Sequence, residues 1–520
     1  MLNYWWMTRP KRKLNPVPEV LAAFSNVALE SRWAGARDVH IRFEEELERD
    51  GLKRVGERRD HSGSGGRTYQ AWLYSLGLIF FQESTGIPYL TLAGEAILAG
   101  KSPVAVLKEQ VLKYQFPSSF SLKTHVAERF KVHPFIFLLR LLEDSRIGYL
   151  TQEEIAKVVI TEGESDSDKC LESVVQKVLA FRDSGDASLP KNFIYDHTPS
   201  TGRVNSDHPY SHLMDVANTI MNWLEYTQLT FRDEKKIMVI PEKADEIKRI
   251  TSAGRPFIGR PEESEYFQRR YGVDPWHVKD TRNLLDTQTV SSKIIDTQRI
   301  KQTFIAYAAH RPISQITHDL ILEIATSTGT DQILVENVLY KEYPHGATGA
   351  FLASYFDMAF KGTEEAVDFE KATTELFQNV FKYNATHLGQ TGSKSAPDIL
   401  LVSDSEGYQS IIDNKAYSKY SITGDHHNRM VHNYIEKISN YSTCSYPIGF
   451  FTYIAGGFGS TFDKQIMDEV KESGCHGSGI TVTTFIKMVE NQTSGTVNYS
   501  HADLRKIFGL DRQVHLSDIE

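Results

Sequence analysis

Residues 395–421 read SAPDILLVSDSEGYQSIIDNKAYSKYS, and the core of the C-terminal part of the chain can be predicted from them. Two apolar runs within it, 399–402 and 408–412, have the composition of short buried strands. Residues 404–407 (DSEG) separate the runs, with aspartate at the first and glycine at the fourth position of a type I turn. The stretch therefore predicts a β-hairpin.

A hairpin centred between Ser405 and Glu406 places Asp398 directly opposite Asp413. Opposed Cα atoms in an antiparallel pair lie about 4.5–5.5 Å apart, so the two carboxylates converge. Lys415 lies two residues beyond Asp413, and side chains at i and i+2 share one face of a sheet. We therefore expect two acids and a lysine to meet at the base of the hairpin.

These three side chains suit the hydrolysis of a phosphodiester. Two carboxylates supply the oxygen ligands that Mg²⁺ prefers, and the bound ion polarises the phosphate and lowers the pKa of its water. A lysine beside them orients or helps to deprotonate that water and offsets the developing negative charge. The alternative is an exposed ion pair, because an aspartate two residues before a lysine often occurs by chance. The matched strands and turn favour a nuclease site.

The composition is ordinary for a globular protein of several domains. The chain has 520 residues, enough for three or four domains, with 40% hydrophobic and 24% charged residues. No apolar run approaches the ~20 residues of a membrane span, and the first residues lack a signal-peptide pattern. Three cysteines without CxxC spacing favour a reducing cytoplasm. The net charge of −9 argues against a chain that coats nucleic acid, but it permits a local basic footprint.

The order helix, hairpin, helix occurs twice in the first 250 residues. The first copy predicts a helix over 68–76, strands over 78–82 and 87–92, and a helix over 93–98. The second copy spans 216–250 and repeats the order. Each copy also carries a tryptophan-leucine pair on its first helix, Trp72-Leu73 and Trp223-Leu224. Both segments are typical of winged helices.

A helix-turn-helix pattern lies between the two copies, at 133–161. Thr151 and Glu154 have the spacing of a capping box that opens the second helix, two residues after a Gly148-Tyr149 turn. One such pattern is weak, since antiparallel helix pairs are common. Three in tandem indicate DNA-reading modules, so we expect a mainly α N-terminal part of winged-helix and helix-turn-helix type.

Basic residues near the N-terminus are candidate DNA contacts. Arg67 begins the helix that such a module inserts into the major groove, and basic flanks hold phosphates. Each residue is also compatible with an ordinary solvated surface. The candidates are Arg9, Lys11, Arg12, Arg54, Arg58, Arg59 and Arg67.

Several segments resemble one family. HLGQTGSKSAPDILL and IIDNKAYS, with ELFQNVFKYN before them and GFFTYIAGGFGSTFDKQI after them, resemble the cleavage domain of FokI-like type IIS restriction endonucleases. These enzymes belong to the PD-(D/E)XK superfamily, an α/β fold, and the resemblance covers roughly 365–510. NYWWMTRP and LKYQFPS are similar to the DNA-reading region of FokI-like and AlwI-type enzymes.

The resemblance implies roles for individual residues. Asp398 and Asp413 would bind Mg²⁺, and Lys415 would be the catalytic lysine. A glutamate on the preceding helix often completes such sites, and Glu370 is the first choice, with Glu375 as the alternate.

Partners also follow from the resemblance: double-stranded DNA, a cognate DNA methyltransferase, and a second copy of the chain on DNA, in the bacterial cytoplasm. The helix expected at 424–437 would carry the dimer contact, through Asp425 and Arg429. Their i, i+4 spacing is equally compatible with a pair inside one helix. A zinc site is an alternative role for this segment, because it carries His426, His427 and His432. No cysteine accompanies these histidines at matching spacing.

We therefore expect four regions: recognition domains at 1–135 and 136–255, a helical bracing region at 256–345, and a cleavage domain at 346–520. The expected activity is a type IIS endonuclease that binds a short asymmetric DNA site and cuts at a fixed distance outside it. A strand-specific nicking enzyme of the same family is one alternative. A non-catalytic DNA-binding regulator with a relic nuclease fold is the other.

Overall fold

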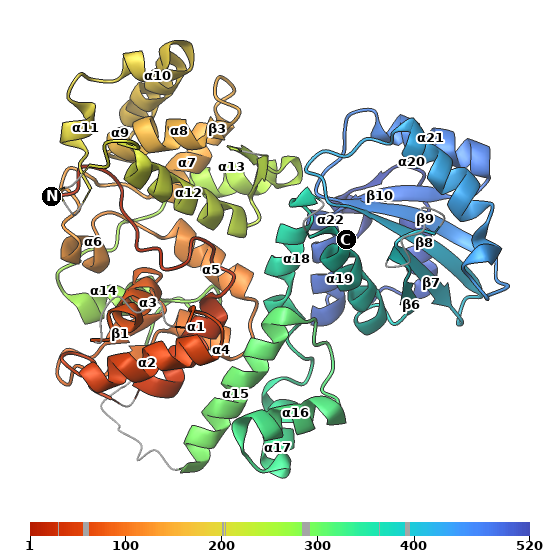
Figure 1. Cartoon of the computed structure of the whole chain (residues 1–520), viewed down its shortest axis with the longest axis horizontal. Coiled ribbons are helices and arrows are strands. Elements are labelled where there is room, and N and C mark those ends of the chain that lie inside the picture. The colour runs from red at the N-terminus through yellow and green to blue at the C-terminus, as the bar shows by residue number, and fades with distance from the viewer. Residues whose placement is uncertain are drawn as a thin grey trace. The chain divides into compact units, whose positions relative to one another are not determined.

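The computed structural model (Figure 1) describes residues 1–29, 31–55, 62–199, 202, 204–233, 235–282, 292–362, 365–389 and 396–520, without the side chains of 292–295 and 298. The chain divides into two units. The first, here the recognition unit, comprises 1–306 and 319–342, and the second, the nuclease unit, comprises 307–318 and 343–520. No helix in these described ranges is both long and apolar enough to cross a lipid bilayer.

The first helix-hairpin-helix segment is confirmed. Strands β1 (Ile79–Phe81) and β2 (Pro88–Leu90) pair antiparallel between α3 (Ser64–Ser75) and α4 (Leu92–Leu98). Trp72 of α3 is fully buried, as its place on the apolar face of the helix predicts. Helix α3 begins four residues before the expected start. The surrounding helices are α1 (Val17–Ala28), α2 (Arg37–Arg49), α5 (Pro103–Leu112) and α6 (Ser119–Lys123).

The second repeat also has the expected order, with β4 (Thr230–Asp233) and β5 (Lys236–Val239) between α12 (Ser211–Tyr226) and α13 (Ala244–Ala253). Strand β3 (Leu150–Thr151) of the helix-turn-helix segment pairs with β5 in the same sheet. The two segments were expected as separate modules, and this expectation is wrong because they share one three-stranded sheet. The capping box is confirmed, with Glu154 N donating to Thr151 Oγ1 at 3.1 Å.

The other elements of the recognition unit are helical. They are α7 (Pro134–Glu143), α8 (Gln152–Glu154), η1 (Ile155–Val159), α9 (Ile160–Glu162), α10 (Asp168–Ser184), η2 (Gly185–Ser188), α11 (Phe193–Asp196), η3 (Pro241–Lys243), α14 (Ser264–Tyr271), α16 (His318–Thr328) and α17 (Gln332–Glu342). Helix α15 (Ser292–His310) begins in this unit and ends in the nuclease unit.

The nuclease unit is built on a six-stranded sheet of order β11-β10-β9-β8-β7-β6. Strand β7 pairs antiparallel with both β6 and β8. The remaining pairs, β8 with β9, β9 with β10 and β10 with β11, are parallel. The strands are β6 (Asn384–His387), β7 (Ile399–Ser403), β8 (Tyr408–Lys415), β9 (Ile448–Ala455), β10 (Gly477–Thr481) and β11 (Gln513–Val514).

Helices cover both faces of this sheet (Figure 1). On one face, Tyr434 and Ile466 pack with Ile411 and Tyr453 of the central strands. They come from the helical segment α20–η7 (Gly424–Asn428, Arg429–Ile435) and from α21 (Phe462–Ser473). On the other face lie α19 (Ala366–Asn379), α22 (Val482–Ser494) and α23 (His501–Phe508). Short helices complete the unit: η4 (Thr348–Ala350), α18 (Leu352–Met358), η8 (Ile438–Asn440) and η9 (Leu516–Asp518).

Candidate active site

The predicted hairpin has the predicted register. Strand β7 pairs with β8 from Ile399 opposite Ile412 to Ser403 opposite Tyr408. One step further along the same register, Asp398 faces Asp413. The two acids lie at the open end of the hairpin, as the turn at 404–407 requires.

Asp413 and Lys415 lie on the same side of β8, as their spacing predicts. Lys415 Nζ lies 2.6 Å from Asp413 Oδ2, and the two side chains are only 14% and 5% exposed. Asp398 is held on the partner strand by Asn414, whose backbone N donates to Asp398 Oδ2 at 2.7 Å. The structure therefore brings all three predicted residues together, and the pair is not an exposed ion pair.

The side chain of Asn414 points to the opposite face of β8 from Asp413 and Lys415. This residue was not identified from the sequence as part of the site. Its side chain donates from Nδ2 to Thr373 Oγ1 of α19 at 2.7 Å, and Thr373 Oγ1 lies 2.9 Å from the Tyr355 hydroxyl. All three side chains are buried. This hydrogen-bonded chain fixes the end of β8 against α19. The sequence signal was the alternation itself, because a polar residue between Asp413 and Lys415 must face the opposite helix layer.

Glu370 of α19 lies near Asp398 and Lys415. Its Oε2 is 2.9 Å from His387 Nε2. Gly389 packs so tightly against it that a Cβ atom there would lie 2.1 Å from the same oxygen. The carboxylate acts electrostatically on both Asp398 and Lys415. The alternate, Glu375, instead interacts with Arg311.

The electrostatics of the site favour binding of a cation. Burial, reinforced by the nearby Asp413, raises the pKa of Asp398 well above its ordinary value. Burial alone would lower the pKa of Lys415, but the Asp413 and Asp398 carboxylates outweigh it and raise that pKa. One lysine thus faces three acids in a largely desolvated site. A divalent cation would relieve this excess of negative charge.

The residues present fit Mg²⁺. Asp398 and Asp413 offer hard oxygen donors, and Mg²⁺ is commonly held by one or two carboxylates together with water and phosphate oxygens. Among the residues that the structure describes, no group of three or more His, Cys, Asp or Glu side chains forms a complete metal site. Two protein ligands are therefore consistent with an ion that completes its coordination with water and DNA phosphate.

The expected dimer pair forms an ion pair within one helical segment, between Arg429 and Asp425. Two of the neighbouring histidines face an acid on α21, whereas His426 Nδ1 lies 3.0 Å from the Tyr420 hydroxyl. His427 Nε2 lies 2.8 Å and His432 Nε2 lies 3.2 Å from the two carboxylate oxygens of Glu472. Within the described part of the chain, these histidines do not form a group of three or more side chains that could hold a zinc ion. These contacts instead pin the segment to α21.

Glu469 of α21 is a buried acid that the sequence pattern did not reveal. Its Oε1 accepts from the Tyr453 hydroxyl at 3.0 Å, and its Oε2 has no hydrogen-bond partner among the described residues. Burial raises its pKa to about 8, opposed by the Tyr453 hydrogen bond and reinforced by Asp413. The folded protein therefore keeps Glu469 protonated at neutral pH, whereas the unfolded chain ionises it near 4.5.

This difference predicts a pH-dependent stability. A raised folded pKa gives stability that is complete below about 4.5 and is lost as the pH rises towards about 8. Glu469→Gln keeps the shape without the titration, so its melting temperature should fall less than the parent's between pH 5 and pH 8. The difference corresponds to a few kcal/mol at most, on the order of 1.4 per pH unit. Thermal unfolding of both proteins checks this, with the exposed Asp468→Asn on the same helix as control. Parallel curves for parent and Glu469→Gln would contradict it.

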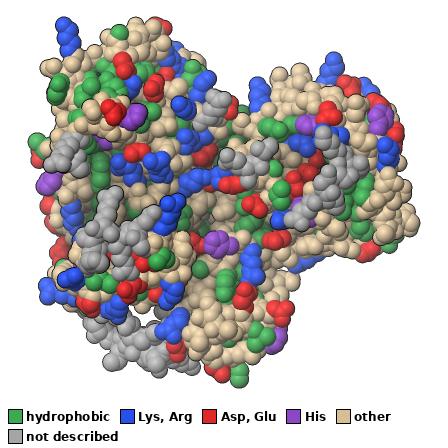
Figure 2. Space-filling view, in the orientation of Figure 1, with side chains coloured by type: hydrophobic (Ala, Val, Ile, Leu, Met, Phe, Trp, Pro, Cys, Tyr) green, Lys and Arg blue, Asp and Glu red, His purple; other side chains and the backbone are tan. Residues whose placement is uncertain are grey.

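The basic candidates that the structure describes all lie in the recognition unit, and Figure 2 shows lysine and arginine side chains gathered across the middle of that unit. Arg67 is exposed on α3 and donates from Nη1 to the Ser62 carbonyl oxygen at 2.7 Å. Arg12 is exposed and lies 2.7 Å from Asp215 Oδ1 of α12. Arg9 and Lys11 are half-buried, Arg54 is exposed, and Arg58 and Arg59 lie outside the described residues.

Comparison with known proteins gives one family match. The family model described as "FokI, cleavage domain" matches residues 329–515. The structure of the restriction endonuclease FokI is similar at 15% identity, over 99% of this chain and 100% of that chain, with a TM-score of 0.29. FokI bound to DNA matches at 16% identity, over 88% and 82%, with a TM-score of 0.28. The BpuJ1 endonuclease binding domain, in complex with modified DNA, matches at 17% identity, over 50% and 92%, with a TM-score of 0.36. No curated protein sequence matches.

The assignment depends on the family match and on the site. The matched residues contain the β7–β8 hairpin with Asp398, Asp413 and Lys415 brought together at its base. They also contain the helix that bears Glu370. Residues 329–515 belong to the FokI cleavage-domain family, and with the site they contain, the C-terminal part of the chain is a FokI-like restriction-endonuclease cleavage domain.

Proposed function

We propose that the recognition unit binds a short asymmetric site in double-stranded DNA, and that the nuclease unit hydrolyses phosphodiester bonds at a fixed distance outside it with Mg²⁺. The observation that carries this proposal is the desolvated group of Asp398, Asp413 and Lys415 inside the matched cleavage domain. The enzyme would act in the bacterial cytoplasm beside a cognate DNA methyltransferase.

The chemistry is divided among the residues of the site. Asp398 and Asp413 would hold the Mg²⁺, which when bound polarises the scissile phosphate and lowers the pKa of a water ligand. Lys415 Nζ keeps its proton, held by Asp413 at 2.6 Å, and is placed to orient the attacking water and to offset charge on the phosphate. Glu370 adds a further carboxylate, oriented by His387. Asn414 keeps the backbone of β8 in register through Thr373.

Recognition would use the helix-hairpin-helix segments as winged helices. Helix α3 carries the exposed Arg67 in its first turn, where a recognition helix meets base edges and phosphates. The remaining basic candidates would hold the DNA backbone and set the register, without reading bases themselves. They are Arg9, Lys11, Arg12, Arg54, Arg58 and Arg59.

Cutting both strands would need a second nuclease unit, because each unit holds one such site. We propose a transient homodimer on DNA through the segment that carries Asp425 and Arg429. Their ion pair lies at the surface, with the Asp425 side chain 68% exposed, so a partner can exchange contacts with it. Without productive dimers the enzyme would nick one strand, which is the nearest alternative activity.

One experiment tests these proposals together. The protein is incubated with a sequenced phage genome in Mg²⁺ at several enzyme concentrations, and every new DNA end is sequenced. We expect double-strand breaks at one constant offset from one motif, with cleavage per enzyme molecule rising with enzyme concentration. Single-strand breaks at a constant offset would favour the nicking enzyme. Motif-specific binding without breaks would favour a DNA-binding regulator.

A further inference from the structure

An exposed turn of the recognition unit presents apolar and basic side chains to solvent. It consists of Pro275, Trp276, His277, Val278 and Lys279, and all five residues are exposed. Trp276 is 51% exposed and Val278 is 98% exposed. A single exposed apolar residue is ordinary, but a tryptophan and a valine two residues apart on one turn form a patch of the kind found at interaction sites.

The acid before this turn is buried and holds the backbone of the turn. The Asp274 side chain is only 5% exposed. Its Oδ1 accepts hydrogen bonds from Trp276 N at 3.1 Å and from His277 N at 2.9 Å, and His277 Nδ1 lies 2.7 Å from the same oxygen. These contacts fix the local shape of the turn and take the charge of Asp274 away from the surface.

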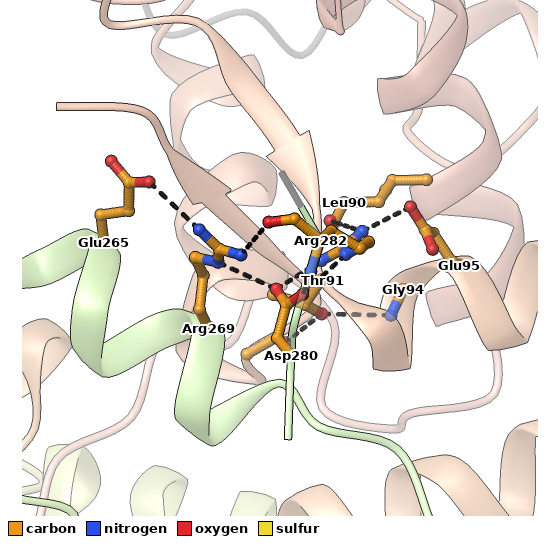
Figure 3. Close-up of polar contacts among 9 residues, drawn as sticks. Leu90, Thr91, Gly94, Glu95, Glu265, Arg269, Asp280 and Arg282 are labelled. Atoms are coloured by element: carbon orange, nitrogen blue, oxygen red, sulfur yellow. Dashed lines mark hydrogen bonds and ion pairs between the residues drawn. The ribbon is translucent and has the colours of Figure 1, made fainter. Parts of the chain in front are cut away.

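The acid after the turn is buried as well (Figure 3). The Asp280 side chain is only 3% exposed and lies between the guanidinium groups of Arg269 and Arg282. Arg269 Nε donates to Asp280 Oδ2 at 2.9 Å, and Arg282 donates from Nη2 to Oδ2 at 2.8 Å and from Nε to Oδ1 at 3.0 Å. Both acids that flank the turn are thus neutralised inside the fold, while the apolar side chains between them face solvent.

The two ends of the turn are tied to the rest of the recognition unit. Before it, Lys113 Nζ donates to the Val273 carbonyl oxygen at 2.6 Å. After it, Arg282 Nη1 donates to the Leu90 carbonyl oxygen at the end of β2 at 3.0 Å. Trp276 is therefore presented from a fixed backbone, so little conformational entropy of the turn would be lost when a partner binds.

The charges exposed beside the patch are positive. Lys101 Nζ lies 5.5 Å from the centroid of the Trp276 ring, and Lys279 belongs to the turn itself. Both lysines are exposed, and none of the five residues of the turn is an acid. An apolar surface with lysines next to it complements DNA, in which phosphates flank the bases that an apolar side chain can contact.

We propose that Trp276 and Val278 form an apolar wedge that inserts at a base step of bound double-stranded DNA, with Lys101 and Lys279 on the neighbouring phosphates. This inference rests on the proposed function, binding of double-stranded DNA by the recognition unit. Apolar side chains that enter a groove in this way partly unstack a base step and kink the duplex. Trp276 supplies most of the contact, because its ring offers the largest flat surface of the turn to the bases.

The first test measures the Kd for a duplex that carries the recognised motif, in chelator so that the DNA is not cut. We expect Trp276→Ala to raise the Kd by about 10- to 100-fold, the size of the effect when an aromatic ring that stacks on a base is removed. Trp276→Phe keeps a ring and should recover most of the affinity. Tyr195→Ala is the matched control, because Tyr195 is also an exposed aromatic residue of the recognition unit, at 79%. It should bind as the parent does.

Quenching of tryptophan fluorescence by acrylamide reports on the contact directly. Trp276 is exposed, whereas the other tryptophans are buried or half-buried: Trp5, Trp6, Trp33, Trp72 and Trp223. We expect the motif duplex to protect the parent from the quencher, and Trp276→Phe to lack the protectable fraction. Protection that grows with protein concentration in the absence of DNA would overturn the proposal, since the patch would then bind a second copy of the chain.

The lysine contact is tested separately by salt dependence. Lys279→Ala should lower the steepness of log Kd against log salt concentration by about 0.9, the contribution of one phosphate contact. A parental slope in this variant would overturn the placement of Lys279 on a phosphate. Parental affinity in Trp276→Ala would overturn the wedge and leave the proposed function intact. A parent that does not bind the motif duplex would overturn the proposed function itself.

Discussion

Replacing Asp413 with asparagine is expected to slow DNA cleavage by at least about a thousandfold without changing binding of the recognised site. Asp413 is buried, lies 2.6 Å from Lys415 Nζ, and is one of two carboxylates that would hold the cation. Asparagine keeps the shape but removes the charge, so the variant loses a metal ligand and leaves Lys415 without its partner. The recognition unit contains neither residue.

The measurement is single-turnover cleavage of a one-site plasmid at saturating enzyme, with gel retardation on the same DNA. Asp404→Asn is the matched control, because Asp404 is an exposed acid in the turn of the same hairpin. It should cleave at the parental rate. If Asp413→Asn cleaved within tenfold of the parent, the hairpin would be a scaffold and the site would lie elsewhere.

The core of this site was predictable from sequence because its contacts are local. Strand alternation and the length of one turn place Asp398, Asp413 and Lys415 together, and the structure confirms the register. A turn of four residues leaves the pairing little freedom, so no distant part of the chain had to be known. The resemblance added Glu370, which the structure places near Asp398 and against His387.

Other features depend on long-range packing that sequence patterns do not encode. Strand β3 is only two residues long and pairs with β5, far along the chain, so nothing near it predicted the shared sheet. Glu469 has the helical spacing of an ordinary amphipathic position, and only the tertiary fold shows that it is buried beside Tyr453. Arg282, which also holds the buried Asp280, contacts Leu90 and Glu95, which are equally remote in sequence. Its contacts come from loops and helix ends without periodicity.

Removing divalent cations is expected to abolish cleavage, by at least about a thousandfold, and added Mg²⁺ should restore it. Chelation alone does not identify the ligands, so the thermal unfolding of the nuclease unit is the second readout. A ligand present at a hundredfold over its dissociation constant stabilises a folded protein by about 2.7 kcal/mol. We therefore expect Mg²⁺ at that excess to raise the melting temperature of the parent. Asp398→Asn should abolish that response.

The metal-free state supplies the decisive contrast, because the same substitution has the opposite effect there. Burial and the neighbouring Asp413 both disfavour a charged Asp398, so a neutral asparagine removes an unfavourable interaction from the empty site. We therefore expect Asp398→Asn to melt at or above the parental temperature in chelator, yet below the parent in Mg²⁺. Asp404→Asn should follow the parent in both conditions. A variant that still gained stability from Mg²⁺ as the parent does would show that the ion binds elsewhere. Equal cleavage by the parent in chelator and in Mg²⁺ would remove the metal from the reaction altogether.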